Sequence, residues 1–391
     1  MSITAPPLSD PAFYADDPHP AYARLRATDP VHWHDDGDFW ALSRHADIVA
    51  VSRDPVTFCS SRGVLMEDRK RGVMGADSIL FLDPPRHQQL RNLVTKGFHP
   101  RQVSALEPRI GELTDQLLDA IEPGQTVDWV ETVAVQLPIL VIADMLGIPH
   151  RDIDQFRIWS DALIEVASNP ESPKMMMAAE LFAYFDAVIA ERREGESGTD
   201  TISVLIDAEV DGEQLSHHEL LGFCMTLLVA GNETTRNLLS GGALALAERP
   251  DSWRQLRDDA SVIPSAVEEL LRWVTPIMTF ARTATRDTEV GGVAVKEGDY
   301  LLMLYASGNR DEAVFGPTAG DVDVTRRPNP HLAFGFGEHF CLGAGLARLE
   351  ARVLLERATA RFGSVECAGA VERMPSTLVN GIEHLPLVFG R

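Results

Sequence analysis

Basic residues are scarce in this sequence of 391 residues. Lysine and arginine together number 35, against 58 aspartates and glutamates, so the formal net charge is −23. Proteins that bind nucleic acid use Lys and Arg to neutralise phosphates. This balance therefore argues against general nucleic-acid binding through a basic surface.

Cysteines are also few, and they are widely scattered. The four are Cys59, Cys224, Cys341 and Cys367, and no two of them form a C-x-x-C pair. This spacing argues against a disulfide scaffold and a zinc site, and it fits a protein of the reducing cytoplasm.

Long apolar runs are missing. The most apolar stretch, 133–148, is interrupted by Gln136, Pro138 and Asp144, so it predicts a buried helix and not a membrane span. The first residues lack the basic flank and apolar core of a signal peptide, and we expect no membrane anchor. Because no repeat or low-complexity linker marks a boundary, we expect residues 1–391 to form a single domain that can bury a large cofactor.

The apolar periodicity that is present is mostly helical. Residues 31–42 predict a hairpin, and 293–295 and 300–304 predict short strands. The helical pattern extends over 101–121, 129–145, 151–168, 173–193, 216–248 and 264–273. The chain is therefore predicted to be mainly α with a small β region.

Residues 334–343, Phe-Gly-Phe-Gly-Glu-His-Phe-Cys-Leu-Gly, place one cysteine directly before an amphipathic helix. The free N–H groups and the dipole of that helix favour a thiolate at Cys341. Gly337 and Gly343 let main chain or a flat ligand approach the sulfur, and Phe334 screens it from water. A dry anionic sulfur suits an axial metal ligand, although a lone cysteine is often only a small buried apolar residue.

A polar cluster occupies the middle of the longest predicted helix, 216–248. There Ala230-Gly231-Asn232-Glu233-Thr234-Thr235 places poor helix formers where Ala or Leu is expected. A threonine hydroxyl can bond to a carbonyl one turn back and open the helix, and Gly231 leaves space for a small ligand such as dioxygen. Glu233 and Thr234 could pass protons to such a ligand, and the alternative is a simple kink.

Two other pairs of charged or polar residues lie on predicted helices. His87 and Arg91 share one face, where they could bind a carboxylate or form an ordinary solvated surface. Glu269 and Arg272 are three residues apart among apolar neighbours, which indicates a buried ion pair.

Together these segments resemble the cytochrome P450 family. Phe-x-x-Gly-x-x-x-Cys-x-Gly is similar to its haem-binding signature, Ala-Gly-x-acid-Thr-Thr to its oxygen-activation motif, and Asp-Pro-Pro-x-His-x-x-x-Arg to its propionate-binding segment. Glu269 and Arg272 match its structural Glu-x-x-Arg pair, which implies a third partner, Arg326. The resemblance runs in order from the hairpin to the turn at 376–382. It implies the cytochrome P450 fold, a single triangular domain with a buried haem.

The resemblance also implies a haem–thiolate monooxygenase that hydroxylates or epoxidises a hydrophobic small molecule with dioxygen. Cys341 would be the axial thiolate ligand of the iron in heme b (iron protoporphyrin IX), and Glu233 and Thr234 would relay protons. The residues expected to hold the cofactor are His87, Arg91, Ala230, Gly231, Arg282, Phe334, His339, Cys341 and Gly343. The two histidines and two arginines among them would neutralise the haem propionates.

The same resemblance implies electrons from a ferredoxin and its reductase, and a monomer in the cytoplasm. We expect Arg348, Arg352 and Arg357 to form a positive docking face for that donor, unless they belong to an ordinary solvated helix face. Residues 98–101, 232–235 and 380–382 are similar to those of family branches that oxidise steroids, branched lipids or terpenoids, and this resemblance implies a substrate of one of these classes.

Three segments are expected at the substrate pocket. The loop 168–173 and the following Met175-Met176-Met177 would form a lid, or these methionines would simply pack a helix. Met278 and Thr279 would face the pocket, and the turn at 376–382 would line it.

Two alternative functions remain. A peroxide-driven haem peroxygenase would not need the acid–threonine pair, so the intact Glu233 and Thr234 argue against it. A non-enzymatic haem sensor or binding protein would need a partner domain, which we do not expect here.

Overall fold

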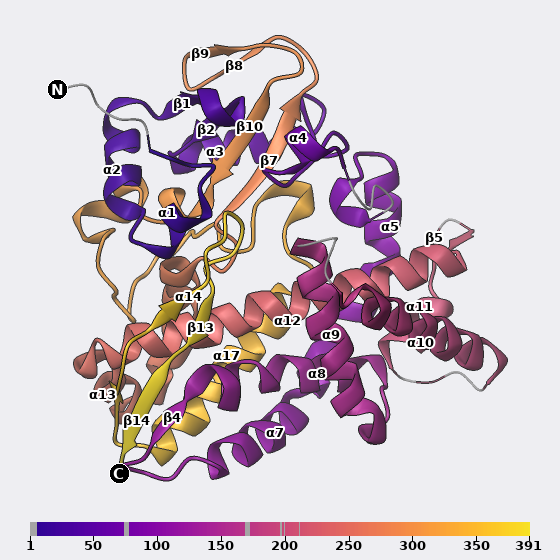
Figure 1. Cartoon of the computed structure of the whole chain (residues 1–391), viewed down its shortest axis with the longest axis vertical. Coiled ribbons are helices and arrows are strands. Elements are labelled where there is room, and N and C mark those ends of the chain that lie inside the picture. The colour runs from indigo at the N-terminus through magenta and orange to yellow at the C-terminus, as the bar shows by residue number, and fades with distance from the viewer. Residues whose placement is uncertain (1–5, 74–77, 169–172, 196–197, 199, 211) are drawn as a thin grey trace.

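The computed structural model describes residues 6–73, 78–168, 173–195, 198, 200–210 and 212–391. Most of its helices lie below a mixed β-sheet in the view of Figure 1. This arrangement confirms the predicted mainly α chain with a small β part. Within the described residues, no helix is both long and apolar enough to cross a membrane.

The longest described helix, α12 (His217–Ala247), crosses the middle of the molecule (Figure 1). It begins with a capping box, in which the Ser216 side chain accepts from the Glu219 N–H and the Glu219 carboxylate accepts from the Ser216 N–H. Pro250 then begins a further helix, α13 (Pro250–Asp258), which the sequence pattern did not indicate.

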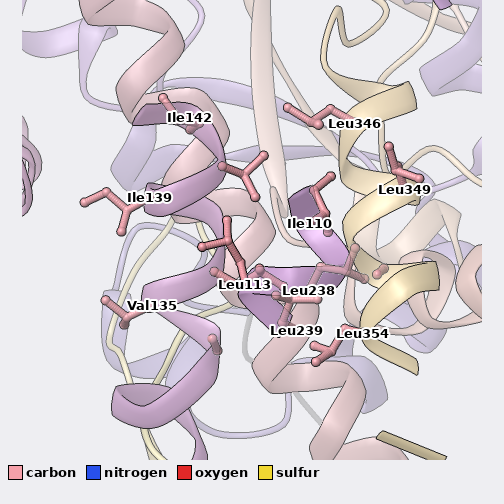
Figure 2. Packing of buried hydrophobic residues seen from close by; sticks show 14 of the residues in the cluster. Ile110, Leu113, Val135, Ile139, Ile142, Leu238, Leu239, Leu346, Leu349 and Leu354 are labelled. Atoms are coloured by element: carbon pink, nitrogen blue, oxygen red, sulfur yellow. The ribbon is translucent and has the colours of Figure 1, made fainter. Parts of the chain in front are cut away.

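The main hydrophobic core surrounds α12. Three helices pack in this core: α7 (Glu107–Asp119), α8 (Gln136–Leu146) and α17 (Ala344–Arg361). Figure 2 shows side chains of this core, among them Leu239 of α12 and Leu354 of α17. Burying a side chain of this size contributes about 1.5–3 kcal/mol. This packing fixes the positions of α12 and α17, which carry or adjoin the predicted site.

The predicted helix over 101–121 is wrong in one respect. The structure divides it into α6 (Pro100–Ala105) and α7, which begins at Glu107. Pro108 lies in the first turn of α7 and has no N–H to donate to a carbonyl one turn back, so a continuous helix is broken there.

The predicted helix over 129–145 also begins differently. A π-helical turn, η4 (Val130–Ala134), precedes α8. The predicted helices over 151–168 and 173–193 are found as α9 (Ile153–Ser168) and α10 (Met175–Glu194), but residues 169–172 of the loop predicted between them lie outside the described residues.

The main sheet has five strands in the order β1-β2-β10-β7-β3. The predicted hairpin is confirmed as β1 (Val31–His34) and β2 (Phe39–Leu42), which pair antiparallel. Strand β10 (Tyr300–Leu304) is buried along its whole length, parallel to β2 and antiparallel to β7 (Thr279–Ala284). Strand β3 (Phe58–Cys59) closes the other edge.

The remaining strands form small sheets at the periphery. They are β11 (Ser364–Cys367), β14 (Pro386–Gly390) and β4 (Thr126–Asp128) in the order β11-β14-β4, and the pairs β5 (Glu209–Val210) with β6 (Glu213–Gln214), β8 (Thr288–Val290) with β9 (Val293–Val295), and β12 (Glu372–Arg373) with β13 (Ile382–His384). The other helices are α1 (Pro11–Ala15), α2 (His19–Thr28), α3 (His45–Arg53), α4 (Asp68–Arg71), α5 (Arg86–Val94), α11 (Thr201–Ile206), α14 (Ile263–Val274), α15 (Tyr305–Gly308) and α16 (Glu312–Phe315).

A buried ion cluster ties α14 to the segment that follows α16. Arg272 donates to both carboxylate oxygens of Glu269, at 2.8 and 2.7 Å, and Arg326 donates to the same carboxylate at 3.1 and 3.2 Å. All three side chains are buried, and Arg272 also donates to three backbone carbonyls. The geometry confirms the predicted partners and indicates a fold-forming cluster.

Candidate active site

The loop before α17 is closed by its own backbone. The Cys341 N–H donates to the Phe334 carbonyl at 2.9 Å, so the residues between them form a narrow turn. Gly337 has a φ of 74°, and a Cβ there would collide with the Ser52 carbonyl of α3. The main chain that approaches at Gly337 is therefore that of α3. At Gly343 a Cβ would lie 4.0 Å from the Cys341 Sγ, an ordinary contact.

The environment of the Cys341 sulfur opposes ionisation. The side chain has an exposed surface, yet protein atoms closely surround the sulfur, and its loss of hydration raises the pKa of the thiol. The N–H groups of Gly343 and Ala344 and the charges of Arg91 and Arg348 act in the opposite direction. The helix terminus therefore acts as predicted, but the expectation of a favoured thiolate is wrong for the protein alone, because desolvation outweighs it. A bound metal cation deprotonates a coordinating thiol.

Two histidines from distant parts of the chain meet beside this loop. The rings of His87 on α5 and His339 on η8 (Gly337–His339) have their centroids 4.1 Å apart. His339 Nε2 lies 3.2 Å from Ser60 Oγ, whereas His87 Nδ1 is buried and has no hydrogen-bond partner among the described residues. Burial lowers the pKa of both imidazoles, that of His87 to about 4, and the charges of Arg91 and Arg282 act on His87 in the same direction.

The two arginines complete the group. Arg91 Nη2 donates to the Phe340 carbonyl at 2.6 Å, directly before Cys341, and Arg282 is buried on β7. The structure thus brings the four predicted propionate partners into one region. A buried, unpartnered imidazole nitrogen and two guanidinium groups suit an anionic ligand such as a pair of carboxylates.

The same region could in principle hold a cation. The ligand atoms of His87, Glu338 and His339 all lie within 4.8 Å of one another. However, Arg91 and Arg282 lie close enough to shift the pKa of His87, and like charges repel. The balance of charge therefore favours an anion over a metal ion at this position.

The polar segment of α12 is helical throughout, so the local opening expected there does not occur. Thr234 Oγ1 donates to the Ala230 carbonyl at 2.6 Å, which confirms the predicted bond one turn back. Glu233 is buried, with Arg236 Nη1 3.7 Å and Asn237 Nδ2 3.4 Å from its carboxylate. The sequence did not indicate these two partners, although both lie within one turn of Glu233.

Ala230 and Gly231 differ in what surrounds them. Ala230 is exposed although it lies midway along a largely buried helix, as contact with a bound group requires. At Gly231, in contrast, a Cβ would lie 2.6 Å from Ile142 Cδ1 of α8. The glycine therefore permits close helix packing on the side where a Cβ would point, and the space for dioxygen beside its backbone stays a prediction.

The arginines of α17 do not form the predicted positive face. Arg348 pairs with Glu268 at 2.7 Å, Arg352 with Glu107 at 2.8 Å, and Arg357 with Asp115 at 3.3 Å; Arg352 also pairs with Glu356 on its own helix. Each guanidinium therefore has a carboxylate partner, so the positive charge predicted for this face is offset, and docking of the donor there stays a prediction. Apart from Glu356, the carboxylates that pair with these arginines lie on α7 and α14. The periodicity of the sequence alone could not show that these two helices lie beside α17.

Two of the segments expected at the substrate pocket contact each other. The Met278 N–H donates to the Leu378 carbonyl at 2.8 Å, and Thr279 Oγ1 donates to the Thr377 carbonyl at 2.8 Å. Met278 and Thr279 are both buried. At the start of α10, Met176 is 74% exposed, and its two methionine neighbours are exposed as well, so the alternative that these residues pack a helix is wrong.

A separate cavity of about 30 Å³ lies within the apolar core. It is lined by side chains of α12, α14, α17 and the peripheral strands, including Trp129, Leu239 and Leu354. None of the residues predicted for the site lines it, so it is a packing defect of the core and not part of this site.

Comparison with known proteins gives a consistent result. The family model described as Cytochrome P450 matches residues 155–381, more than half of the chain. A putative cytochrome P450 of Bacillus subtilis is 38% identical, with 94% of this chain and 92% of that protein covered. The steroid C26-monooxygenase of Mycobacterium tuberculosis is 37% identical, with 98% and 96% covered. The vitamin D(3) 25-hydroxylase of Pseudonocardia autotrophica is also 37% identical, with 95% and 94% covered.

Solved structures agree with these relatives. A cytochrome P450 of Bacillus megaterium in complex with testosterone has a TM-score of 0.87 at 34% identity, with 95% of this chain and 99% of that chain covered. A cytochrome P450 of Chondromyces apiculatus has a TM-score of 0.89 at 37% identity, with 98% and 97% covered.

Proposed function

This chain belongs to the cytochrome P450 family of monooxygenases, whose members bind haem b through a cysteine thiolate, and we propose that Cys341 is the axial ligand. The observation that carries this assignment is the loop 334–343, which places an exposed cysteine directly before α17. Of the other cysteines, Cys59 and Cys224 are buried, and Cys367 lies on the peripheral strand β11.

The chemistry divides between the cofactor and the chain. Bound haem supplies the activation of dioxygen and the transfer of one of its oxygen atoms to the substrate, while the other oxygen atom leaves as water after the uptake of two electrons and two protons. Cys341 would hold the iron of bound haem through its sulfur and supply electron density to it. His87, Arg91, Arg282 and His339 bind the haem carboxylates, which would otherwise be costly buried anions.

Proton delivery is assigned to Glu233 and Thr234. The Thr234 hydroxyl, which donates to the Ala230 carbonyl, would donate instead to a bound ligand when that bond is released. Arg236 Nη1 lies 3.7 Å and Asn237 Nδ2 lies 3.4 Å from the Glu233 carboxylate, so these neighbours on α12 help to position it for proton transfer.

The substrate is proposed to be a steroid or another isoprenoid-like hydrophobic molecule. Two relatives of this chain are named as a steroid C26-monooxygenase and a vitamin D(3) 25-hydroxylase, and a third is named linalool 8-monooxygenase. The exposed methionines at the start of α10 add an adaptable apolar surface that suits such ligands.

Optical titration of the purified haem-loaded protein tests the substrate class. Addition of a steroid should shift the haem absorption and saturate, because a bound apolar molecule displaces water from the iron. A panel of steroids, branched lipids and linear terpenoids separates the classes. A saturable shift with none of the steroids or terpenoids would contradict the proposal.

Electrons are proposed to come from a separate ferredoxin and its reductase, with the protein acting as a monomer in the cytoplasm. A purified ferredoxin–reductase pair should support turnover in air, and hydrogen peroxide without reductase should support little. The opposite result would favour the peroxygenase. The haem-sensor alternative is disfavoured because the relatives are named as enzymes.

A further inference from the structure

Glu268 connects two elements that flank the Cys341 loop. It lies on α14, one residue before the buried ion cluster. Its carboxylate accepts from Arg348 Nε at 2.7 Å and Nη2 at 2.9 Å, and its Oε2 lies 3.0 Å from His331 Nε2. Burial would raise the pKa of Glu268, but the bonds from His331 and Arg348 hold it at about 2, so the carboxylate is ionised.

Both partners of Glu268 reach the aromatic ring that begins the loop. The Arg348 guanidinium carbon lies 4.5 Å from the centroid of the Phe334 ring, and the His331 ring centroid lies 5.9 Å from it. The Phe334 carbonyl in turn accepts the Cys341 N–H. A continuous set of contacts therefore runs from the Glu268 carboxylate to the backbone of Cys341.

Arg348 also acts on the sulfur directly. Its guanidinium packs on Phe334, whose carbonyl accepts the Cys341 N–H, so its positive charge lies beside the loop that carries the sulfur and favours a negative charge there. Because the paired carboxylate of Glu268 carries the opposite charge, the field of Arg348 at the sulfur is reduced by that pairing. The electrostatic potential at the sulfur therefore depends on both Arg348 and Glu268.

We propose that Glu268 is a positioning residue for the Cys341 thiolate, which holds Arg348 against Phe334 and balances its charge, and so sets how much electron density the sulfur gives to iron. This inference rests on the proposed function, in which Cys341 binds the haem iron. Donation by a thiolate falls when nearby cations stabilise its charge, and the reduction potential of the iron then rises. An unbalanced Arg348 therefore makes the iron easier to reduce.

The test is the midpoint reduction potential of the haem-loaded protein, measured by optical redox titration. Glu268→Gln leaves Arg348 without its ionised partner and should shift the potential to a more positive value. Arg348→Ala removes the cation and should shift it to a more negative value. Opposite signs from the two members of one pair indicate an electrostatic action on the sulfur, whereas a purely structural role predicts no shift or shifts of the same sign.

A matched control is available on α17. Glu356 pairs with Arg352 and has no contact with the Cys341 loop among the described residues, so Glu356→Gln removes the same charge without the proposed effect. Glu268→Asp should restore a potential near that of the unmodified protein. If Glu268→Gln does not retain haem, the two Arg348 variants still test the proposal. Arg348→Ala should shift the reduction potential to a more negative value, whereas Arg348→Lys, which keeps the positive charge, should not.

Two failures are distinguishable. If the reduced, carbon-monoxide-treated wild-type protein lacks the red-shifted absorption of thiolate ligation, the assignment of Cys341 fails, and the inference fails with it. If that absorption is present and the potentials of Glu268→Gln and Glu356→Gln match the wild type, the role of Glu268 alone is overturned.

Discussion

Ile142 of α8 occupies the position that a side chain at Gly231 of α12 would require. An added Cβ would lie 2.6 Å from Ile142 Cδ1, well inside the distance at which two carbon atoms can pack. The conformation of Gly231 is helical, so its lack of a side chain serves the contact between two helices and not an unusual backbone. This contact brings α8 close to the segment of α12 that carries Glu233 and Thr234.

Gly231→Ala should therefore destabilise the protein by overpacking, by about 1 kcal/mol, the low end of the usual range, because the nearest atom is the end of the Ile142 side chain. Denaturant unfolding measures the change, and Ile142→Val in the same chain should recover part of it, because it removes the methyl group nearest to the added Cβ. Gly241→Ala is a comparison at a second tight position of α12, where the nearest atoms belong to Val274. A stability unchanged by Gly231→Ala, with activity alone reduced, would show that the glycine serves a ligand.

Cys341→Ala should abolish the red-shifted absorption of the reduced carbon-monoxide complex and all oxygen-dependent turnover. The expected loss is complete because the remaining thiols are buried or lie on a peripheral strand. Cys367→Ser is the matched control, since it removes the other exposed thiol. An intact absorption band in Cys341→Ala would refute the ligand assignment.

Thr234→Ala should separate oxygen consumption from product formation. Loss of the hydroxyl removes one carrier of protons, so product formed per dioxygen consumed should fall, by about 100-fold if the full effect of one acid–base group is lost. Peroxide released into solution should rise in step and can be measured directly. Thr226→Ala, two turns earlier on α12, removes a similar carbonyl-bonded hydroxyl and should leave the ratio unchanged.

Stability should depend on pH through Glu350, which lies on α17 with 1% of its surface exposed. Its Oε2 has no hydrogen-bond partner in the described part of the chain, and burial raises the pKa of this carboxyl to about 8. The folded state therefore holds a proton that the unfolded state loses between about pH 4.5 and 8. The contribution of Glu350 to stability falls as pH rises through this window and is lost above it.

Glu350→Gln should consequently be more stable than the parent near pH 8 by a few kcal/mol, and the two should converge near pH 4.5. Urea unfolding at several pH values measures this difference. Glu356→Gln, a more exposed change on the same helix, provides the baseline. If the stability of all three proteins depended on pH in the same way, the raised pKa of Glu350 would be contradicted.

Arg272→Ala should lower the stability of the fold strongly, because this arginine is fully buried. It leaves the Glu269 carboxylate buried with Arg326 and Asn329 as its remaining side-chain partners, which costs about 3–5 kcal/mol. Thermal unfolding of the haem-free protein should show the loss. Arg257→Ala, which breaks an exposed pair with Asp258, should change stability by less than about 1 kcal/mol.

The features that sequence predicted well are local in the chain. The hairpin formed by β1 and β2 and the position of Cys341 before a helix each depend on residues within a few positions of one another. The break before α7 is also a local signal, because Pro108 indicates a helix start and not a helix interior.

The features that sequence missed depend on neighbours from distant segments. Whether Arg348 is a free cation depends on Glu268, which lies 80 residues earlier in the chain. The ionisation of Cys341 depends on how many atoms surround the sulfur, and no spacing of residues reports that quantity. The same holds for Gly231, whose packing against Ile142 follows from the crossing of two helices.

The pairing of the α17 arginines also bears on how an electron donor finds this protein. Paired opposite charges produce a field that fades quickly with distance, so α17 exerts little long-range attraction, while the whole chain carries a net charge of −23. An acidic donor is then repelled at long range. Its rate of encounter should increase as ionic strength rises, until the screening length falls below the separation of the two surfaces.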